Sequence, residues 1–582
     1  MKTVPIVISD RIRLPKKYIP TKDIKKRYVI ELYDESNCAT CTNRPDRGPE
    51  NEICQGCKSF MGVHRFYNSA EAKEGVWSLP QADLLGVKTY LRSKGLDFKI
   101  KDKRKEKKFK HDIKFTGKLF GKGDIDDEGF KRANQKFAIK QWMKHKTGIV
   151  VAKARSGKTV LSTYSYCKLG VRTVIVANQR ELLNQFYETA TGKAPPKYLH
   201  GKFVDSDVKA GRKAMTNIAI LEEETGQKII FLPKNFAQLE TFIKKHGPPD
   251  VLLVPYQSFM HDASRVHNVI NKYYSMVIVD EEHGTGATQY LAFIARLNLL
   301  YRMGLTATPH RKDGKSKLSA RVMGPVVAQI SGASIQPKII FYPVKAKPTS
   351  KHKTWTGAEA WLKRSKDRNI EIVQQVFSDL RSGDNVIIIP VNHKDHQDAL
   401  VKMINKQAEF NARERGENWP VKLARPFHAD VDRQKTLAWV DSYDKKGRVS
   451  KKLPTNSPRV IVAIRSMIQQ GIDMKRPSMV YLIIPMSGKY YVGAPMAYQL
   501  FCRVATPYRD KPEAKVKIFV DNVPFFAKCI QSLLFNEILP KSNLKKEKDF
   551  DYKLDSATYA QAKSLLNARS DSRSRKTVKW WE

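Results

Sequence analysis

The chain has 582 residues, 41% of them hydrophobic and 10% aromatic, with 105 Lys and Arg against 58 Asp and Glu. This length predicts three or four structural units rather than one core. The formal net charge of +47 predicts a polyanionic partner, usually nucleic acid. No apolar run approaches the roughly 20 residues that span a bilayer, and the first residues do not resemble a secretory signal. We therefore expect a soluble intracellular protein, in the cytoplasm, or in the host cytoplasm if the chain is phage-encoded.

Four of the seven cysteines lie in one N-terminal cluster. Cys38 and Cys41 form one CxxC pair and Cys54 and Cys57 form a second, with twelve residues between the pairs. This spacing is typical of a structural Zn²⁺ site with four thiolate ligands. Intracellular disulfides are the weaker alternative. His64 is a further candidate ligand, although a surface or core histidine is the more ordinary interpretation.

Two segments follow the cysteines. The apolar spacing of residues 79–96 predicts a helix. A basic run over residues 98–110 combines cations with aromatic residues and suits phosphate contacts and base stacking, although a solvated charged loop explains it equally well. With the cysteine cluster, these segments form a predicted N-terminal accessory module over residues 1–125.

Short apolar strands separated by helical stretches fill most of the remaining chain. Each strand ends in polar or glycine-containing residues, as in parallel sheets that present a site at their carboxyl ends. The pattern predicts an α/β fold with two tandem lobes at residues 126–335 and 336–540, then a basic C-terminal extension at 541–582. The expected strands are 148–154, 172–178, 250–256, 275–281 and 301–307 in the first lobe, and 385–391, 459–465 and 479–485 in the second.

A phosphate-binding loop is predicted where the strand 148–154 meets a helical stretch. Residues 152–159 spell AKARSGKT, which matches the P-loop pattern except that Ala152 replaces the first glycine. In such a loop Lys158 reaches the β- and γ-phosphate oxygens, and the Thr159 hydroxyl joins the Mg²⁺ shell. The tripeptide at its end is weak evidence alone, but the strand–loop–helix context strengthens it. The residues predicted to bind ATP here are Ala154, Arg155, Ser156, Gly157, Lys158 and Thr159.

Two carboxylates end the expected strand 275–281. Asp280 and Glu281 follow an apolar run, where adjacent acidic side chains are costly unless they serve an ion. We expect Asp280 to hold Mg²⁺ through water and Glu281 to polarise the attacking water. An acidic loop that caps a helix is the ordinary alternative, and the P-loop makes it the weaker one.

The order of these and further motifs resembles superfamily 2 helicases, in particular the XPB-like and UvsW-like DNA helicases. The motifs AKARSGKT, IVANQRELLNQF, DEEH, GLTATPHRKDG, GIDM and QLFCR fall between about residues 126 and 530. The resemblance implies two RecA-like domains and an ATPase stimulated by single-stranded, forked or branched DNA, in recombination, repair or replication. A duplex translocase that never unwinds and an ATP-gated nucleic-acid-binding scaffold remain alternatives.

The resemblance also implies a role for each matching residue. The residues placed at the adenine are Arg132 and Gln135. The residues placed at the nucleotide in the second lobe are Gly471, Asp473 and Gln499, with Arg503 as the catalytic cation. The residues that couple hydrolysis to lobe movement are His283, Thr306 and Thr308. The residues placed on the nucleic acid are Arg180 and Arg311.

Two departures from the helicase pattern affect the predicted catalysis. Arg155 replaces a usual P-loop glycine, and Thr506 stands where a second arginine is expected. An arginine finger stabilises the charge of the transition state, so its loss would slow hydrolysis. Arg503 remains at its motif position, and Arg509 or Arg465 are the alternative sources of the finger.

Overall fold

The structure is a computed structural model. It describes residues 3–9, 11–33, 60–65, 69–126, 131–153, 156–177, 180–191, 197–199, 202–204, 218–219, 229–280, 293–307, 315–331, 335–348, 355–420, 422–428, 430–431, 436, 439–440, 457–469, 474, 476–486, 493–506, 511, 513–545 and 550–570. These residues form two compact units, the first within residues 1–126 and 131–332 and the second within 333–578. No helix among them is long and apolar enough to cross a membrane.

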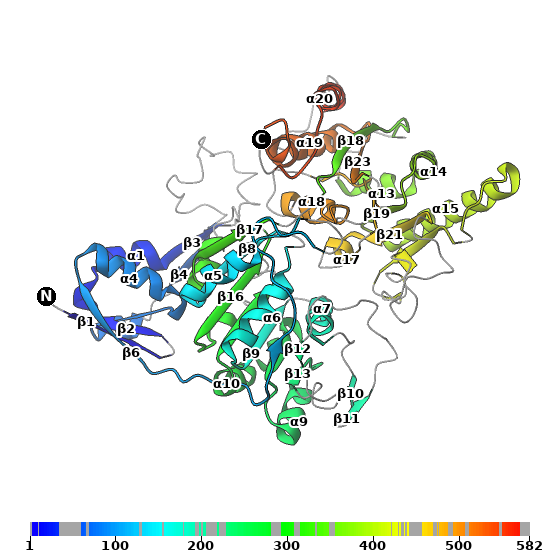
Figure 1. Cartoon of the computed structure of the whole chain (residues 1–582). Coiled ribbons are helices and arrows are strands. Elements are labelled where there is room, and N and C mark those ends of the chain that lie inside the picture. Colours follow the sequence, from blue (N-terminus) through cyan, green and yellow to red (C-terminus); the bar gives the residue numbers. More distant parts are fainter. Residues whose placement is uncertain are drawn as a thin grey trace. The chain divides into compact units, whose positions relative to one another are not determined.

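A seven-stranded sheet forms the centre of the first unit (Figure 1). Its strand order is β13-β14-β9-β15-β16-β8-β17, and all neighbouring strands run parallel. The strands are β8 (Thr147–Ala152), β9 (Thr173–Ala177), β13 (Ile230–Phe231), β14 (Val251–Pro255), β15 (Met276–Asp280), β16 (Tyr301–Thr306) and β17 (Val326–Ile330). All five predicted strands are present, whereas β13 and β17 were not predicted.

Helices cover both faces of this sheet because alternate strand residues point to opposite sides. Val150 of β8 lies in a core with α5, α6 and α7, whereas Ile149 and Val151 lie in a second core with α9, α10 and α12. The helices are α5 (Gln135–His145), α6 (Lys158–Leu169), α7 (Arg180–Thr191), α9 (Phe236–His246), α10 (Ala263–Tyr273) and α12 (Lys315–Met323). Strand residues that are apolar on both faces are therefore what the layered fold requires.

The N-terminal part of this unit forms a smaller sheet in the order β5-β2-β1-β6. Its main elements are β1 (Thr3–Ile8), β2 (Ile12–Pro15), α1 (Thr21–Tyr28), β5 (Val76–Leu79), α4 (Leu84–Ser93) and β6 (Asp97–Asp102). The predicted helix at 79–96 is therefore wrong at its start, because Leu79 ends a strand and Pro80 precedes a short turn before α4 begins. The basic run begins as strand β6, so the alternative of a solvated loop does not hold for its first residues.

The small sheet shares its core with the first lobe. Ile6 and Leu14 belong to the same buried cluster as Val174 of β9. Buried Asp83 joins the two parts through charge, since it bonds Arg27 of α1 at 2.7 Å and lies 3.5 Å from Arg321 of α12. The N-terminal module therefore packs directly against the first lobe and shares a hydrophobic core with it.

The second unit is built on a six-stranded parallel sheet in the order β18-β23-β22-β19-β21-β20. The strands are β18 (Lys338–Pro343), β19 (Val386–Val391), β20 (Ala424–Phe427), β21 (Arg459–Ile464), β22 (Met479–Leu482) and β23 (Lys515–Val520). The helices are α13 (Trp355–Arg364), α14 (Lys366–Arg381), α15 (Lys394–Arg415), α17 (Arg465–Gln469), α18 (Gly493–Phe501), α19 (Pro524–Leu533) and α20 (Ser556–Ser570). Two parallel α/β sheets are thus present, consistent with tandem RecA-like domains.

Candidate nucleotide site

The loop before α6 makes a left-handed turn at Gly157. Its φ is 83°, where a side chain is strained, and an added Cβ would lie 2.1 Å from Nε2 of Gln135. Helix α6 begins at the next residue, Lys158. The turn therefore places the first N–H groups of a helix at the carboxyl edge of the parallel sheet, an arrangement that binds phosphate.

Gln135, the first residue of α5, supports this loop. Its Nε2 donates to the Ser156 carbonyl at 3.0 Å, and its Oε1 accepts from the Phe120 N–H at 3.2 Å. Only 4% of Gln135 is exposed. A side-chain amide has two N–H groups and two carbonyl lone pairs, so each end keeps capacity for a further bond. Gln135 can therefore hold the loop and still bond to a base.

Two of the three predicted catalytic side chains of the first lobe meet at the same sheet edge. Nζ of Lys158 lies 3.6 Å from Oδ1 of Asp280, at the end of β15. Strand β16 separates β15 from β8, and its last residue, Thr306, is fully buried beside them. Because all three strands run parallel, the loop, Thr306 and Asp280 share one edge. Lys158 and Asp280 therefore lie side by side at this edge of the sheet.

An aromatic residue that was not predicted for the site, Phe120, lies beside Gln135. The guanidinium of Arg132 lies 5.8 Å from the Phe120 ring centroid and pairs with Asp126. Nζ of Lys118 lies 5.4 Å from the same centroid. Phe120 bonds through its backbone to Gln135, so an aromatic face, two cations and an amide gather near the loop. Such a group suits a purine base, which stacks on aromatic and guanidinium planes. None of the sequence motifs that identify the P-loop includes Phe120.

Several predicted site residues lie outside the described residues. They are Ala154, Arg155, Glu281, His283, Thr308, Arg311, Gly471, Asp473 and Arg509, and the zinc ligands Cys38, Cys41, Cys54 and Cys57. Next to the cysteines, β3 (Val29–Tyr33) pairs antiparallel with β4 (Phe60–Arg65). This pairing brings together the two ends of the segment that carries the cysteines.

Arg180 opens α7 and is exposed. Its Nη1 donates to the Pro233 carbonyl at 3.0 Å, and its Nη2 lies 3.4 Å from the Leu232 carbonyl. These bonds tie the start of α7 to the chain just after β13. The guanidinium is therefore oriented by the fold, and its exposure leaves it accessible to a phosphate.

The second unit carries the remaining described candidates. Gln499 lies near the end of α18 and Arg503 in the turn after it, both half-buried. Thr506 is 8% exposed, and its Oγ1 donates to the Met474 carbonyl at 3.2 Å. The position of the expected second arginine is therefore inside the lobe. Arg465, a suggested substitute, begins α17, and burial lowers its pKa against the opposing effect of the Glu359 carboxylate.

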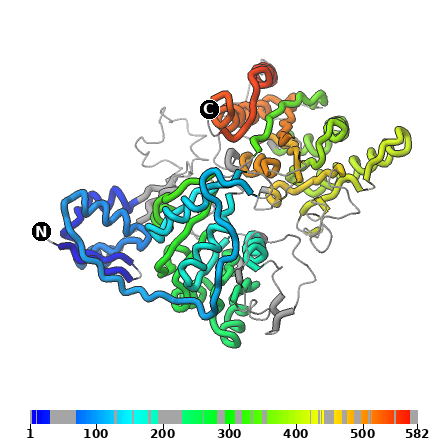
Figure 2. Tube along the Cα trace, viewed as in Figure 1, coloured from blue at the N-terminus to red at the C-terminus, as the bar shows by residue number. Residues whose placement is uncertain are grey.

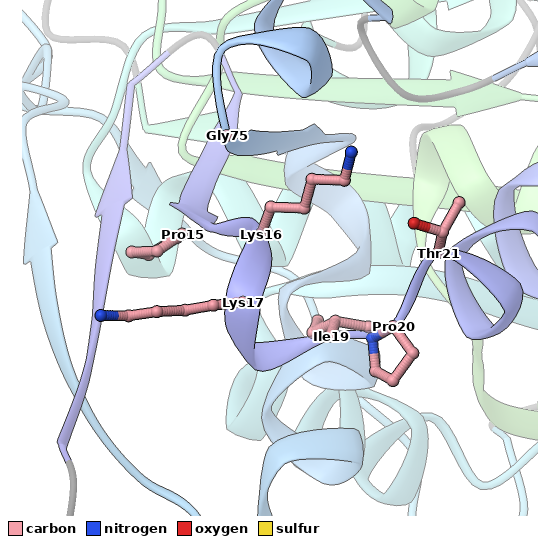
Figure 3. Close-up of a pocket in the computed structure, with 7 residues that line it drawn as sticks. All are labelled: Pro15, Lys16, Lys17, Ile19, Pro20, Thr21 and Gly75. Atoms are coloured by element: carbon pink, nitrogen blue, oxygen red, sulfur yellow. The ribbon is translucent and has the colours of Figure 1, made fainter.

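A separate hollow lies in the N-terminal module (Figure 3). Its lining residues are Pro15, Lys16, Lys17, Ile19, Pro20, Thr21 and Gly75. The two lysine side chains diverge from one short helical turn. None of these seven lining residues is a carboxylate, whereas the edge at Lys158 carries Asp280, so the edge at Lys158 is the candidate site.

Comparison with known proteins points to the same part of the chain. Residues 130–311 match the family model described as "Type III restriction enzyme, res subunit", or ResIII. The DNA 3'-5' translocase XPB2 of Sulfurisphaera tokodaii is 26% identical over 219 residues. The chain is similar to superfamily 2 helicases. The XPB2 match covers 37% of this chain and spans 39% of that protein's length.

Two solved structures are similar to the described fold. T4 UvsW matches over 95% of this chain and 99% of its own, with 14% identity and a TM-score of 0.34. The Mycobacterium smegmatis helicase Lhr, solved with ssDNA and AMP-PNP, matches over 75% of this chain and 51% of its own. Its identity is 16% and its TM-score 0.41.

Proposed function

We propose that this chain is an ATP-dependent DNA helicase or translocase whose hydrolysis site lies at the carboxyl edge of the seven-stranded sheet. The observation that carries the proposal is the Lys158–Asp280 ion pair behind the left-handed turn at Gly157. An ammonium at a helix amino terminus attracts phosphate, and a carboxylate beside it suits a metal. Both groups are mostly buried, which strengthens their interaction with a charged ligand.

The triphosphate binds where α6 begins, and Lys158 exchanges Asp280 for the β- and γ-phosphate oxygens. Asp280 and Thr159 are the residues that would hold Mg²⁺, which would neutralise charge on those oxygens. Water attacks the γ-phosphorus and gives its proton to Glu281, while the bond from that phosphorus to the β–γ bridging oxygen breaks and ADP leaves. Arg503 is the proposed finger of the second lobe.

DNA is the proposed partner, with forked or branched DNA as the favoured substrate. The net charge of +47 supports a polyanion, and the named activity of the XPB2 relative supports DNA. Arg180, which is exposed and oriented, is the described residue proposed to contact the backbone. Recombination, repair or replication is the proposed setting.

The experiment is ATP turnover without nucleic acid and with single-stranded DNA, duplex, forked DNA and RNA. We expect stimulation by DNA, loss of nucleotide affinity in Lys158→Ala, and tight binding with almost no turnover in Glu281→Gln. Parental turnover in Glu281→Gln would refute the assignment of the base. If nucleic acid does not stimulate the parent chain, the ATP-gated scaffold replaces the motor. Stimulation by duplex without strand separation would instead identify a translocase.

We also propose that Cys38, Cys41, Cys54 and Cys57 bind one structural Zn²⁺. The two CxxC pairs support this, as does the β3–β4 pairing, which closes the segment between them. Elemental analysis should find about one Zn²⁺ per chain. A Cys54→Ser variant should lose metal and lower the unfolding temperature, whereas Cys167→Ser should retain the metal. A folded, metal-free parent protein would refute the site.

A further inference from the structure

The basic segment 97–110 is held in a fixed path along the first unit. Its first part is β6, the edge strand of the small sheet, and its second part crosses the amino edge of the seven-stranded sheet (Figure 2). The Lys107 N–H donates to Ser275 Oγ at 2.6 Å, and the Lys107 carbonyl accepts from the Arg172 N–H at 2.8 Å. Ser275 and Arg172 directly precede β15 and β9.

Further bonds extend this attachment. Nη1 of Arg104 donates to the Leu299 carbonyl at 3.3 Å, close to the start of β16. The N–H groups of Lys110 and His111 donate to buried Asp250 at 2.8 and 3.1 Å, just before β14. Hydrogen bonds therefore hold the segment to residues at the start of four neighbouring strands, β14, β9, β15 and β16. Fastening removes conformational freedom before any ligand binds, which lowers the entropic cost of binding.

Most of the basic side chains in this segment are exposed. Residues 97–110 contain eight basic and three acidic residues. Of the acids, Asp102 pairs with Arg104 at 2.7 Å, and Glu106 bonds Tyr301 at 2.5 Å and Lys108 at 2.7 Å. The exposed lysines that have no ion-pair partner among the described residues are Lys99, Lys101, Lys103, Lys105 and Lys110.

We propose that this lysine row is a second nucleic-acid-binding surface, which contacts the phosphate backbone at the edge opposite the nucleotide. The inference rests on the proposed function and adds to it a contact that none of the motif residues supplies. In a parallel sheet the amino ends lie at one edge and the carboxyl ends, with Lys158 and Asp280, at the other. A bound backbone here leaves the nucleotide edge clear.

The ordinary role of edge-strand lysines explains only part of the row. Lysine on an edge strand blocks pairing with another chain, which accounts for Lys99 and Lys101 of β6. It does not account for Lys103, Lys105 and Lys110, because the part of the segment after β6 is already bonded to the first lobe. A series of exposed cations on a fixed backbone suits a series of phosphates, whose binding releases counterions.

The test is DNA affinity as a function of salt. A variant with Lys99, Lys101, Lys103 and Lys105 changed to Gln is titrated against a fluorescein-labelled duplex with a single-stranded arm. Each lost phosphate contact lowers the slope of log K against log salt by about 0.9, so we expect a loss of about three or more and about tenfold or more weaker binding at low salt. Changing the same four residues to Arg should keep parental affinity.

The matched control changes four exposed lysines of the second unit to Gln. They are Lys402, Lys406, Lys528 and Lys563. The control loses the same net charge, so equal slopes of log K against log salt for the control and test variants would overturn the proposed binding surface. Unchanged DNA affinity with lost binding to phosphatidylserine vesicles would also overturn it, in favour of a membrane. Stimulated turnover of the parent, measured in the same titration, tests the proposed function independently. Thermal unfolding checks that each variant is folded.

Discussion

Replacing Gly157 with Ala should weaken nucleotide binding by about two orders of magnitude. A left-handed φ costs a non-glycine residue about 1–2 kcal/mol, and the φ here is 83°. The new Cβ would lie 2.1 Å from Nε2 of Gln135, so the amide must move and give up its bonds to Ser156 and Phe120. Each bond is worth about 1 kcal/mol. The total of about 3 kcal/mol corresponds to roughly a hundredfold in affinity.

The assay is titration of a fluorescent ATP analogue with the parent, Gly157→Ala, Gln135→Ala and the double variant. Removing the Gln135 side chain removes the clash, so the Gly157 change should cost only the backbone strain in that background. Gly170→Ala is the matched control, because Gly170 ends the same helix at a φ of 62° with nothing within 4 Å of an added Cβ. It should lower stability by a similar strain but leave nucleotide affinity unchanged.

Parental affinity in Gly157→Ala would refute the loop geometry as the binding conformation. Equal costs of the Gly157 change with and without the Gln135 side chain would refute the contact between them. A loss of affinity in Gly170→Ala as large as that in Gly157→Ala would mean that general destabilisation, rather than the phosphate loop, is being measured.

Three further outcomes are expected. Arg503→Ala should cut ATP turnover by about a thousandfold, as removal of an arginine finger does, and a binding titration should show parental DNA affinity. Turnover equal to that of the parent would exclude Arg503 as the finger. Thr506→Arg should lower the unfolding temperature and not raise turnover, because the side chain is buried and bonded to Met474; faster hydrolysis would contradict this. His396 is 3% exposed, its Nε2–H donates to Asn369 Oδ1 at 3.1 Å, and burial lowers its pKa to about 3. The unfolded histidine gains a proton below pH 6.5 that the folded one does not, so stability should fall by up to about 1.4 kcal/mol per pH unit down to pH 3. Urea unfolding should show a shallower acid loss in His396→Gln, and an equal loss would exclude this residue as the cause.

The strands of both large sheets could be predicted because their residues are buried on both faces. Residues 276–280, for example, are all buried, and the first four of them form an unbroken apolar run before Asp280. Strand β6 was missed because exposed Lys99 and Lys101 alternate with half-buried Phe98 and Ile100, and the lysines dominate its composition. Alternation of this kind is the signal that identifies a half-buried strand.

The pairing of Lys158 with Asp280 could be predicted because each motif follows a parallel strand. The contact of Gln135 with Gly157 could not, since it depends on where α5 lies against the loop. The position of Phe120 beside Gln135 likewise depends on the path of the chain before α5, which no local sequence pattern specifies. Thr506 is buried by packing with segments distant in sequence, including Met474, to which it bonds. Contacts made by tertiary packing thus leave no local motif in the sequence.

The core that the N-terminal sheet shares with the first lobe affects how truncations must be interpreted. Removing the chain before α5 would uncover apolar side chains of the first lobe and leave Arg321 without the carboxylate of Asp83. It would also remove the amide partner of Gln135 at Phe120. A shortened protein that aggregates or hydrolyses ATP poorly would therefore report a damaged motor lobe, even if the deleted residues never touch DNA. Point substitutions on the surface of the small sheet separate recognition from folding, whereas deletion of the sheet confounds them.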